Sequence, residues 1–321
     1  MTEAHQSARD QTTSTQTSQA PDLSVRIAGL VLKNPVIAAS GTFGYGREYE
    51  GLIDVSRLGG ICTKGLTLYP REGNRGRRLH ETPSGLMNSI GLENPGIPAF
   101  IEKELPAMLG LGPAVIANLS GSTVEEYQEG ARLLGATGID MIELNISCPN
   151  VKAGGMAFGL CPADASSVVR AVRKVSSKPL MVKLSPNAPD LAGVAQACVD
   201  AGADALSLVN TFKALAFDIR RRRPVFDHVT AGLSGPAIKP IALRMVWDVC
   251  AAVQVPVVGM GGIAIAEDAL EFFMAGAAAI QVGTATFPRP SAMIEIIEGL
   301  ERFMKTEGIG QLSELSLQGK Y

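Results

Sequence analysis

Residues 255–284 read VPVVGMGGIAIAEDALEFFMAGAAAIQVGT, and this stretch decides the fold. Two apolar runs with glycine-rich ends flank a helical segment: Val255 to Met260 with Gly261-Gly262, Ala266 to Met274, and Ala278 to Val282 with Gly283-Thr284. Short apolar runs that alternate with amphipathic helices are typical of repeated βα units around a parallel sheet. The stretch therefore predicts two parallel strands joined by a helix.

The same alternation begins at Asn34, upstream of this stretch. Six further apolar runs are Val36 to Ala39, Gly60 to Thr63, Ala114 to Leu119, Met141 to Ile146, Leu180 to Leu184 and Ala205 to Val209. Two further helices are predicted, Thr123 to Leu134, opened by a capping box of Ser122 and Glu125, and Ile238 to Val253.

Polar residues or glycines stand at the ends of all eight apolar runs. The six earlier ends are Ser40-Gly41-Thr42, Thr63-Lys64-Gly65, Asn118, Asn145 to Asn150, Lys183 with Ser185, and Asn210-Thr211. An open doubly wound sheet concentrates its chemistry at one switch point, whereas a barrel brings every strand end to one mouth. The sequence therefore predicts an α/β protein with a (β/α)8 TIM barrel.

The chain is predicted to hold one barrel domain, residues 23–321, after a disordered Ser/Thr/Gln-rich tail, residues 1–22. Leu23 to Leu32 alternates apolar and polar residues and is expected to form a hairpin that plugs the barrel floor. Three long βα connections, Gly65 to Pro98, Ser147 to Pro162 and Thr211 to Lys239, are expected to rise over one face.

Composition excludes several classes of function. The 321 residues carry a net charge of -2, so no general basic field favours nucleic acid. The basic run Arg220 to Arg223 is interpreted as a solvated loop. Five cysteines without a C-x-x-C pair, and three histidines, predict no metal site and free thiols in the cytoplasm. No apolar run approaches about 18 residues, so no membrane span is expected.

The glycines after the last two strands predict a phosphate site, because glycine lets backbone N–H groups approach an anion. Gly259 to Ala264 also matches a relaxed dinucleotide fingerprint, G-x-G-x-x-A, but no acidic residue lies between Phe272 and Ile294 to hold a ribose. Glycines that merely ease tight turns are the plainer alternative.

Four strand-end residues, Asn118, Asn145, Lys183 and Asn210, are expected to face a flat, hydrogen-bonding ligand. Lys183 would suit the negative charge that a reduced flavin carries. Each of the four is equally explained as a satisfied core polar group. Cys148, held in a loop by Pro149, is a candidate base, whereas Cys62, Cys198 and Cys250 lie inside strand or helix patterns.

Three motifs resemble the dihydroorotate dehydrogenases, and the resemblance runs from about Leu23 to Phe303. They are Asn88-Ser89-Ile90-Gly91-Leu92-Glu93-Asn94, Asn145 to Asn150 with Val151-Lys152-Ala153-Gly154-Gly155, and Gly232-Leu233-Ser234-Gly235-Pro236-Ala237. The resemblance implies an FMN-linked oxidoreductase barrel that oxidises dihydroorotate to orotate in pyrimidine biosynthesis.

Residue roles follow from the resemblance alone. Cys148 would remove the C5 proton while hydride leaves C6 for the flavin N5. Substrate-binding positions would be Lys64, Asn88, Gly91, Leu92, Asn145, Asn210 and Thr211, where Thr211 replaces a serine frequent in relatives. FMN-binding positions would be Ala39, Ser40, Lys64, Asn118, Asn145, Lys183, Val209, Gly235, Gly261, Gly262, Gly283 and Thr284.

The branches of this family differ in base and electron acceptor. Cys148 and the polar tail are unlike the membrane-bound, quinone-using members, and the run Ser147 to Gly159 looks like the NAD-linked branch. Members of that branch pair a homodimeric core with a second subunit that carries FAD and a 2Fe-2S cluster, as a heterotetramer. A fumarate-linked enzyme, a flavin barrel acting on another pyrimidine, and a non-redox phosphate-binding isomerase or lyase are the alternatives.

Overall fold

The computed structural model describes residues 21–147 and 158–320. Eight parallel strands form a closed barrel in the order β10-β15-β16-β3-β4-β7-β8-β9. Their bounds are β3 Val36–Ala38, β4 Gly60–Cys62, β7 Ala114–Leu119, β8 Met141–Asn145, β9 Leu180–Lys183, β10 Ala205–Leu208, β15 Val257–Met260 and β16 Ala279–Val282. Each strand coincides with one of the eight predicted apolar runs, so the predicted barrel is confirmed.

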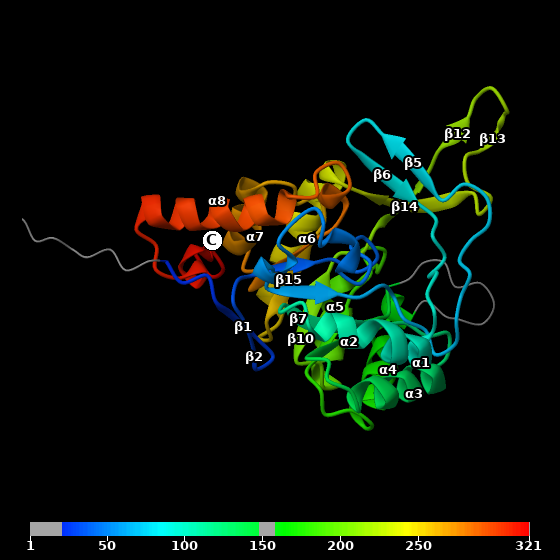
Figure 1. Cartoon of the computed structure of the whole chain (residues 1–321), viewed down its shortest axis with the longest axis horizontal. Helices are drawn as coiled ribbons and strands as arrows, with labels where there is room; N and C mark the ends of the chain where they lie inside the picture. Colours follow the sequence, from blue (N-terminus) through cyan, green and yellow to red (C-terminus); the bar gives the residue numbers. More distant parts are fainter. Residues whose placement is uncertain (1–20, 148–157, 321) are drawn as a thin grey trace, which may run out of the picture.

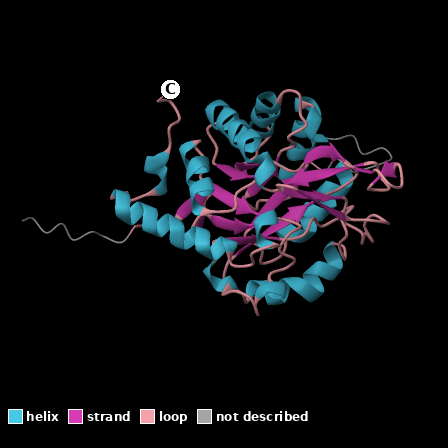
Figure 2. Cartoon of the chain, turned by 90° about the horizontal axis from the view of Figure 1, so that it is seen from above, coloured by secondary structure: helices cyan, strands magenta, loops and turns pink. Residues whose placement is uncertain are grey.

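Helices surround this barrel, with the strands in the middle of the view from above (Figure 2). The helices of eight or more residues are α3 Val124–Gly135, α4 Pro162–Arg173, α5 Leu191–Asp200, α6 Lys239–Ala252, α7 Ala266–Met274 and α8 Ala292–Glu307, and the shorter α1 Ile97–Ala99 and α2 Leu105–Leu109 follow β4. The predicted capping box before α3 is wrong by one residue. The hydroxyl of Thr123, not Ser122, accepts from the Glu126 N–H, because Thr123 is the last residue in extended backbone.

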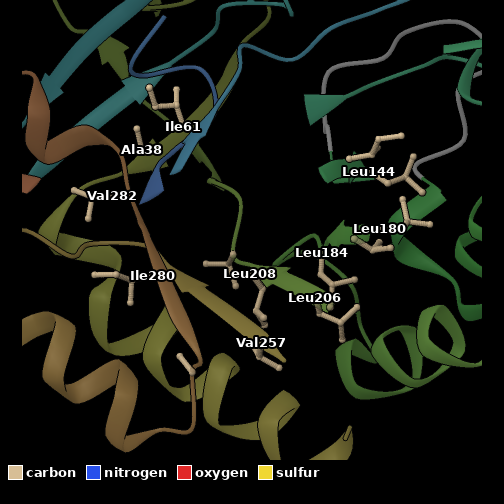
Figure 3. Packing of buried hydrophobic residues seen from close by; sticks show 14 of the residues in the cluster. Ala38, Ile61, Leu144, Leu180, Leu184, Leu206, Leu208, Val257, Ile280 and Val282 are labelled. Carbon is tan, nitrogen blue, oxygen red and sulfur yellow. The ribbon is translucent and has the colours of Figure 1, made fainter. Parts of the chain in front are cut away.

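Alternate side chains of the strands pack outward against the helices (Figure 3). The figure labels Ala38, Ile61, Leu144, Leu180, Leu184, Leu206, Leu208, Val257, Ile280 and Val282 in this layer. Because successive strand residues point to opposite faces, the residues between them point into the barrel. Burial on both faces explains why the strands are nearly continuous apolar runs in the sequence.

The lower barrel interior is apolar and is closed by an N-terminal hairpin. Strands β1 Val25–Ile27 and β2 Leu30–Leu32 pair antiparallel through a two-residue turn, Ala28-Gly29, with positive φ at both positions. Ile27 and Leu32 are buried against inward residues of the barrel such as Met181. The predicted plug of the barrel floor is therefore confirmed.

A four-stranded antiparallel sheet is built from two of the long connections. Its order is β11-β14-β6-β5, with β5 Leu79–Thr82, β6 Gly85–Asn88, β11 Phe212–Leu215 and β14 Thr230–Ser234. Figure 1 shows β5, β6 and β14 at the end of the molecule away from β1 and β2, with β12 Phe217–Asp218 and β13 Arg223–Pro224 beyond them. Strands β12 and β13 form a hairpin, and Arg220 to Arg223 are exposed in it. This agrees with the interpretation of the basic run as a solvated loop.

None of the helices within residues 21–147 and 158–320 has both the length and the apolar character needed to cross a membrane.

Candidate active site

A cavity of about 1060 Å³ lies at the carboxyl ends of the barrel strands and continues beneath the four-stranded sheet. This volume slightly exceeds the range for one small-molecule ligand, about 300 to 1000 Å³, so the cavity has room for a cofactor beside a small substrate. Sixteen of the predicted site residues line it: Ala39, Ser40, Lys64, Asn88, Gly91, Leu92, Asn145, Lys183, Val209, Asn210, Thr211, Gly235, Gly261, Gly262, Gly283 and Thr284. Residues from distant parts of the chain thus meet at one site.

One described residue of the predicted set, Asn118, does not line the cavity. Asn118 is fully buried, where it donates to Glu143 at 2.5 Å and accepts from Asn145 at 3.2 Å. Cys148 lies outside the described residues. Its neighbour Ser147 is described, and its hydroxyl accepts from Asn210 at 2.7 Å and donates to Asn145 at 2.7 Å.

One end of the cavity is lined by backbone N–H groups without partners. Within the described residues, the N–H groups of Gly261, Gly262, Gly283 and Thr284 donate to no protein acceptor. Gly261 and Gly262 have φ of 118° and 80°, conformations that L side chains rarely adopt. Such a pair of glycine turns, one of them preceding the N-terminus of α7, suits an anion such as a phosphate.

Two lysines, Lys64 and Lys183, also line the cavity. Lys183 is only 5% exposed. In the part of the chain that the structure describes, neither ammonium group forms a salt bridge with a carboxylate. A ligand with negative charge or several acceptor atoms would satisfy both groups.

Glu143 stands in the barrel interior directly beneath this cavity, and it is 0% exposed. Its two carboxylate oxygens accept four hydrogen bonds, from Cys62 at 3.1 Å, Asn118 at 2.5 Å, Ser207 at 2.8 Å and Gln281 at 2.5 Å. Together these five residues form a polar layer between the apolar floor and the cavity.

The polar layer keeps Glu143 ionised. Burial by itself would raise the pKa of this carboxyl, but the positive charge of Lys183 and the hydrogen bonds from Gln281, Cys62 and Ser207 outweigh it, and the pKa lies below its usual value. Burial, and then the negative charge of Glu143, raise the pKa of the Cys62 thiol well above its usual value. Cys62 is therefore a neutral hydrogen-bond donor at physiological pH.

Strand β6 of the four-stranded sheet, and the loop after it, bring three further predicted substrate residues to the cavity. Asn88 on β6 donates to the Gly232 carbonyl on β14 at 3.3 Å. After it, Gly91 and Leu92 have φ of 79° and 57°. A non-glycine residue in this conformation stores backbone strain, which is commonly found where a loop is shaped for a ligand. With this backbone conformation, Gly91 and Leu92 both line the cavity.

These features fit a flavin mononucleotide. The free N–H groups suit its phosphate, and the lysines with the amide groups suit the acceptor-rich pyrimidine edge of its ring. No group of three or more His, Cys, Asp or Glu side chains within the described residues is placed to hold a metal ion.

Two residues that lie in or next to the cavity were not predicted from the sequence. Glu143 is an acidic residue inside an apolar run, and Gln281 an amide inside another. That signal, a polar residue at an inward position of a fully buried strand, was available for both, because a buried strand tolerates such a residue only with partners.

Comparison with known proteins identifies the family. A family model described as dihydroorotate dehydrogenase matches residues 22–304. The chain belongs to the dihydroorotate dehydrogenase family. The resemblance seen in the motifs is thereby confirmed.

Among the relatives of this chain are three proteins named dihydroorotate dehydrogenase B (NAD(+)), catalytic subunit. The protein from Petrotoga mobilis is 60% identical over 294 residues, which cover 92% of this chain and 98% of the relative. Those from Pelobacter propionicus and Thermoanaerobacter pseudethanolicus are 55% and 53% identical, each over 92% of this chain and 97% of the relative. These names support the NAD-linked branch rather than the fumarate-linked alternative, and family membership disfavours a non-redox isomerase or lyase.

Proposed function

We propose that this chain binds FMN in the cavity, oxidises dihydroorotate to orotate in pyrimidine biosynthesis, and passes the electrons to NAD through a second subunit. The observation that carries the proposal is the cavity of about 1060 Å³ itself. Among the described residues, its backbone N–H groups donate to no protein acceptor, and its two lysines form no salt bridge. A phosphate group and an acceptor-rich ring on one molecule would satisfy both sets.

The chain's residues divide the cavity between cofactor and substrate. FMN would be held by Gly261, Gly262, Gly283 and Thr284 at its phosphate, with the remaining cofactor contacts from Ala39, Ser40, Lys64, Asn145, Lys183, Val209 and Gly235. Asn118, predicted as a cofactor contact, would act from behind the cavity wall through its hydrogen bond with Asn145. When bound, FMN supplies the hydride acceptor. Dihydroorotate would lie against Lys64, Asn88, Gly91, Leu92, Asn145, Asn210 and Thr211, with the Lys64 ammonium neutralising its carboxylate.

Cys148 is proposed as the base that removes the C5 proton. The proposal is supported by its described neighbour Ser147, which is fixed at the cavity by Asn145 and Asn210. Asn145 and Asn210 both line the cavity, so the segment that leads into Cys148 starts at the substrate side.

The test is Cys148→Ser, examined by anaerobic mixing of the flavin-loaded protein with dihydroorotate. Flavin bleaching should slow by roughly two to four powers of ten, the usual scale for a lost general base, while FMN and orotate still bind. Cys161→Ser is a matched control, because Cys161 is an exposed thiol at the start of α4. Bleaching at a near-normal rate in Cys148→Ser would remove Cys148 from this role.

A second subunit is proposed because the relatives are named as catalytic subunits of NAD-dependent enzymes. The assembly would be a homodimer of this chain with two electron-transfer subunits carrying FAD and a 2Fe-2S cluster. The isolated chain should bleach with dihydroorotate but reduce NAD slowly. Rapid NAD reduction by this chain alone would contradict the proposal.

We also propose a reducing, cytoplasmic location, since the four cysteines of the described residues are free thiols. Bleaching by dihydrouracil and not by dihydroorotate would favour the alternative of a flavin barrel for another pyrimidine.

A further inference from the structure

Glu143 is the one fully buried carboxylate among the described residues. Burying an ionised carboxylate is costly, and an apolar side chain of similar size would fill the same interior position without that cost. The barrel instead surrounds it with four donors from four other strands, Cys62, Asn118, Ser207 and Gln281. The residue roles proposed above leave this charge unused.

The polar layer is connected directly to the cavity wall. Gln281 donates to Glu143 at 2.5 Å and itself lines the cavity. On the other side, Asn145 lines the cavity and donates to Asn118, which donates to Glu143. The carboxylate is therefore one side chain away from any ligand in the cavity, and it shares the barrel interior with the Lys183 ammonium.

The orientation of Gln281 follows from this contact. A carboxylate accepts only, so Gln281 must turn its amide nitrogen toward Glu143, and its amide oxygen is left buried without a donor in the described structure. Glu143 thus fixes both a charge beneath the cavity and the direction of an amide dipole at its wall.

We propose that Glu143 is a positioning residue that sets the reduction potential of the flavin, by opposing the Lys183 charge and by orienting Gln281. The inference rests on the proposed function, since it needs FMN in the cavity. Reduction of a flavin places negative charge near its pyrimidine ring. Lys183 stabilises that charge, and Glu143 opposes it, so the pair holds the potential below the value that the lysine alone would give.

A purely structural role makes a different prediction. If Glu143 only filled and cross-linked the barrel interior, its replacement would change stability without a directed change in potential. The measured potential of the bound flavin therefore separates the two roles.

The experiment equilibrates flavin-loaded protein with a reference dye under slow anaerobic reduction, and follows both spectra. In Glu143→Gln, the preference for reduced over oxidised flavin should rise about tenfold, the scale of one charge at close range in a protein, which is ~30 mV upward for a two-electron couple. Lys183→Met should move the potential downward. Ser207→Ala is the matched control, because it removes one hydrogen bond to Glu143 at 2.8 Å and keeps the charge; its potential should stay near that of the wild type.

A further variant covers the case in which Glu143→Gln does not fold. Glu143→Gln with Lys183→Met removes both buried charges, and its potential should be higher than that of Lys183→Met alone by a similar tenfold ratio. A potential that is unchanged or lowered on removal of Glu143, in either background, would overturn this role. Wild-type protein that binds no flavin would overturn the proposed function itself, a separate outcome visible before any variant is made.

Discussion

Gly262→Ala is expected to weaken FMN binding while leaving the barrel folded. A Cβ atom at this position would lie 2.8 Å from the backbone N and Cα of Lys239, at a backbone φ of 80°. Lys239 cannot easily move away, because its ammonium is held by Asp268 at 2.7 Å and Glu271 at 3.1 Å. The loop must therefore shift, and its N–H groups move with it.

The size of the effect follows from those N–H groups. Each hydrogen bond to a charged phosphate contributes about 1.5–3 kcal/mol, so losing one should weaken FMN binding roughly ten- to a hundred-fold. Titration of the flavin-free protein with FMN, followed by the quenching of flavin fluorescence, measures this change, and thermal unfolding checks the fold.

Gly308→Ala is the matched control. Gly308 also has a positive φ, 68°, at the C-terminus of α8, but no atom lies within 4 Å of its Cβ position. It should lose about 1 kcal/mol of stability and bind FMN normally. If both variants bound FMN with equal affinity, the assignment of the Gly261-Gly262 turn to the phosphate would be refuted.

Three further predictions concern the barrel interior. Leu32→Ala should lower the free energy of unfolding, measured by chemical denaturation, by about 2–5 kcal/mol because it leaves a cavity at the barrel floor. Val31→Ala is the control: Val31 is 54% exposed, so the change should be less than about 0.5 kcal/mol. Alkylation with mass-spectrometric readout should label the exposed Cys161 and spare Cys62, whose pKa is raised by burial and by Glu143; labelling of native Cys62 would argue against the polar layer. The pKa of Glu143 is lowered in the folded state, so its ionised form contributes its full stability above pH 4.5, the unfolded value, and this stability is lost as the pH falls through the folded value. The difference in Tm between wild type and Glu143→Gln should therefore shrink as the pH falls below 4.5. A difference that stayed constant with pH would contradict the lowered pKa.

The barrel and the cavity lining could be predicted from the sequence because both depend on local patterns. A strand buried on both faces is an almost continuous apolar run in the sequence. A polar residue at the carboxyl end of a barrel strand lies at the one mouth of the barrel that all strand ends share, and Lys183 and Asn210 line the cavity there. The N-terminal hairpin could also be predicted from the sequence, because the Ala28-Gly29 turn separates two short runs of alternating apolar and polar residues.

The rest depended on contacts between distant positions. The four donors to Glu143 lie between 25 and 138 residues from it in the sequence, and no local pattern specifies such a set. The four-stranded sheet was predicted only as long connections, because β6 pairs with β14, at Asn88 and Gly232, and four of the eight barrel strands lie between them in the sequence. The helix start at Val124 was misplaced because Ser122 and Thr123 are equally good caps in sequence terms.

The side chains of the β1–β2 hairpin close the lower end of the barrel. In the described structure, small molecules therefore reach the cavity from the opposite rim, at the carboxyl ends of the strands. A protein that docked over that rim would control both the binding of a small molecule to the cavity and its release. Subunit assembly would therefore affect the rate of turnover through the position of the cavity alone.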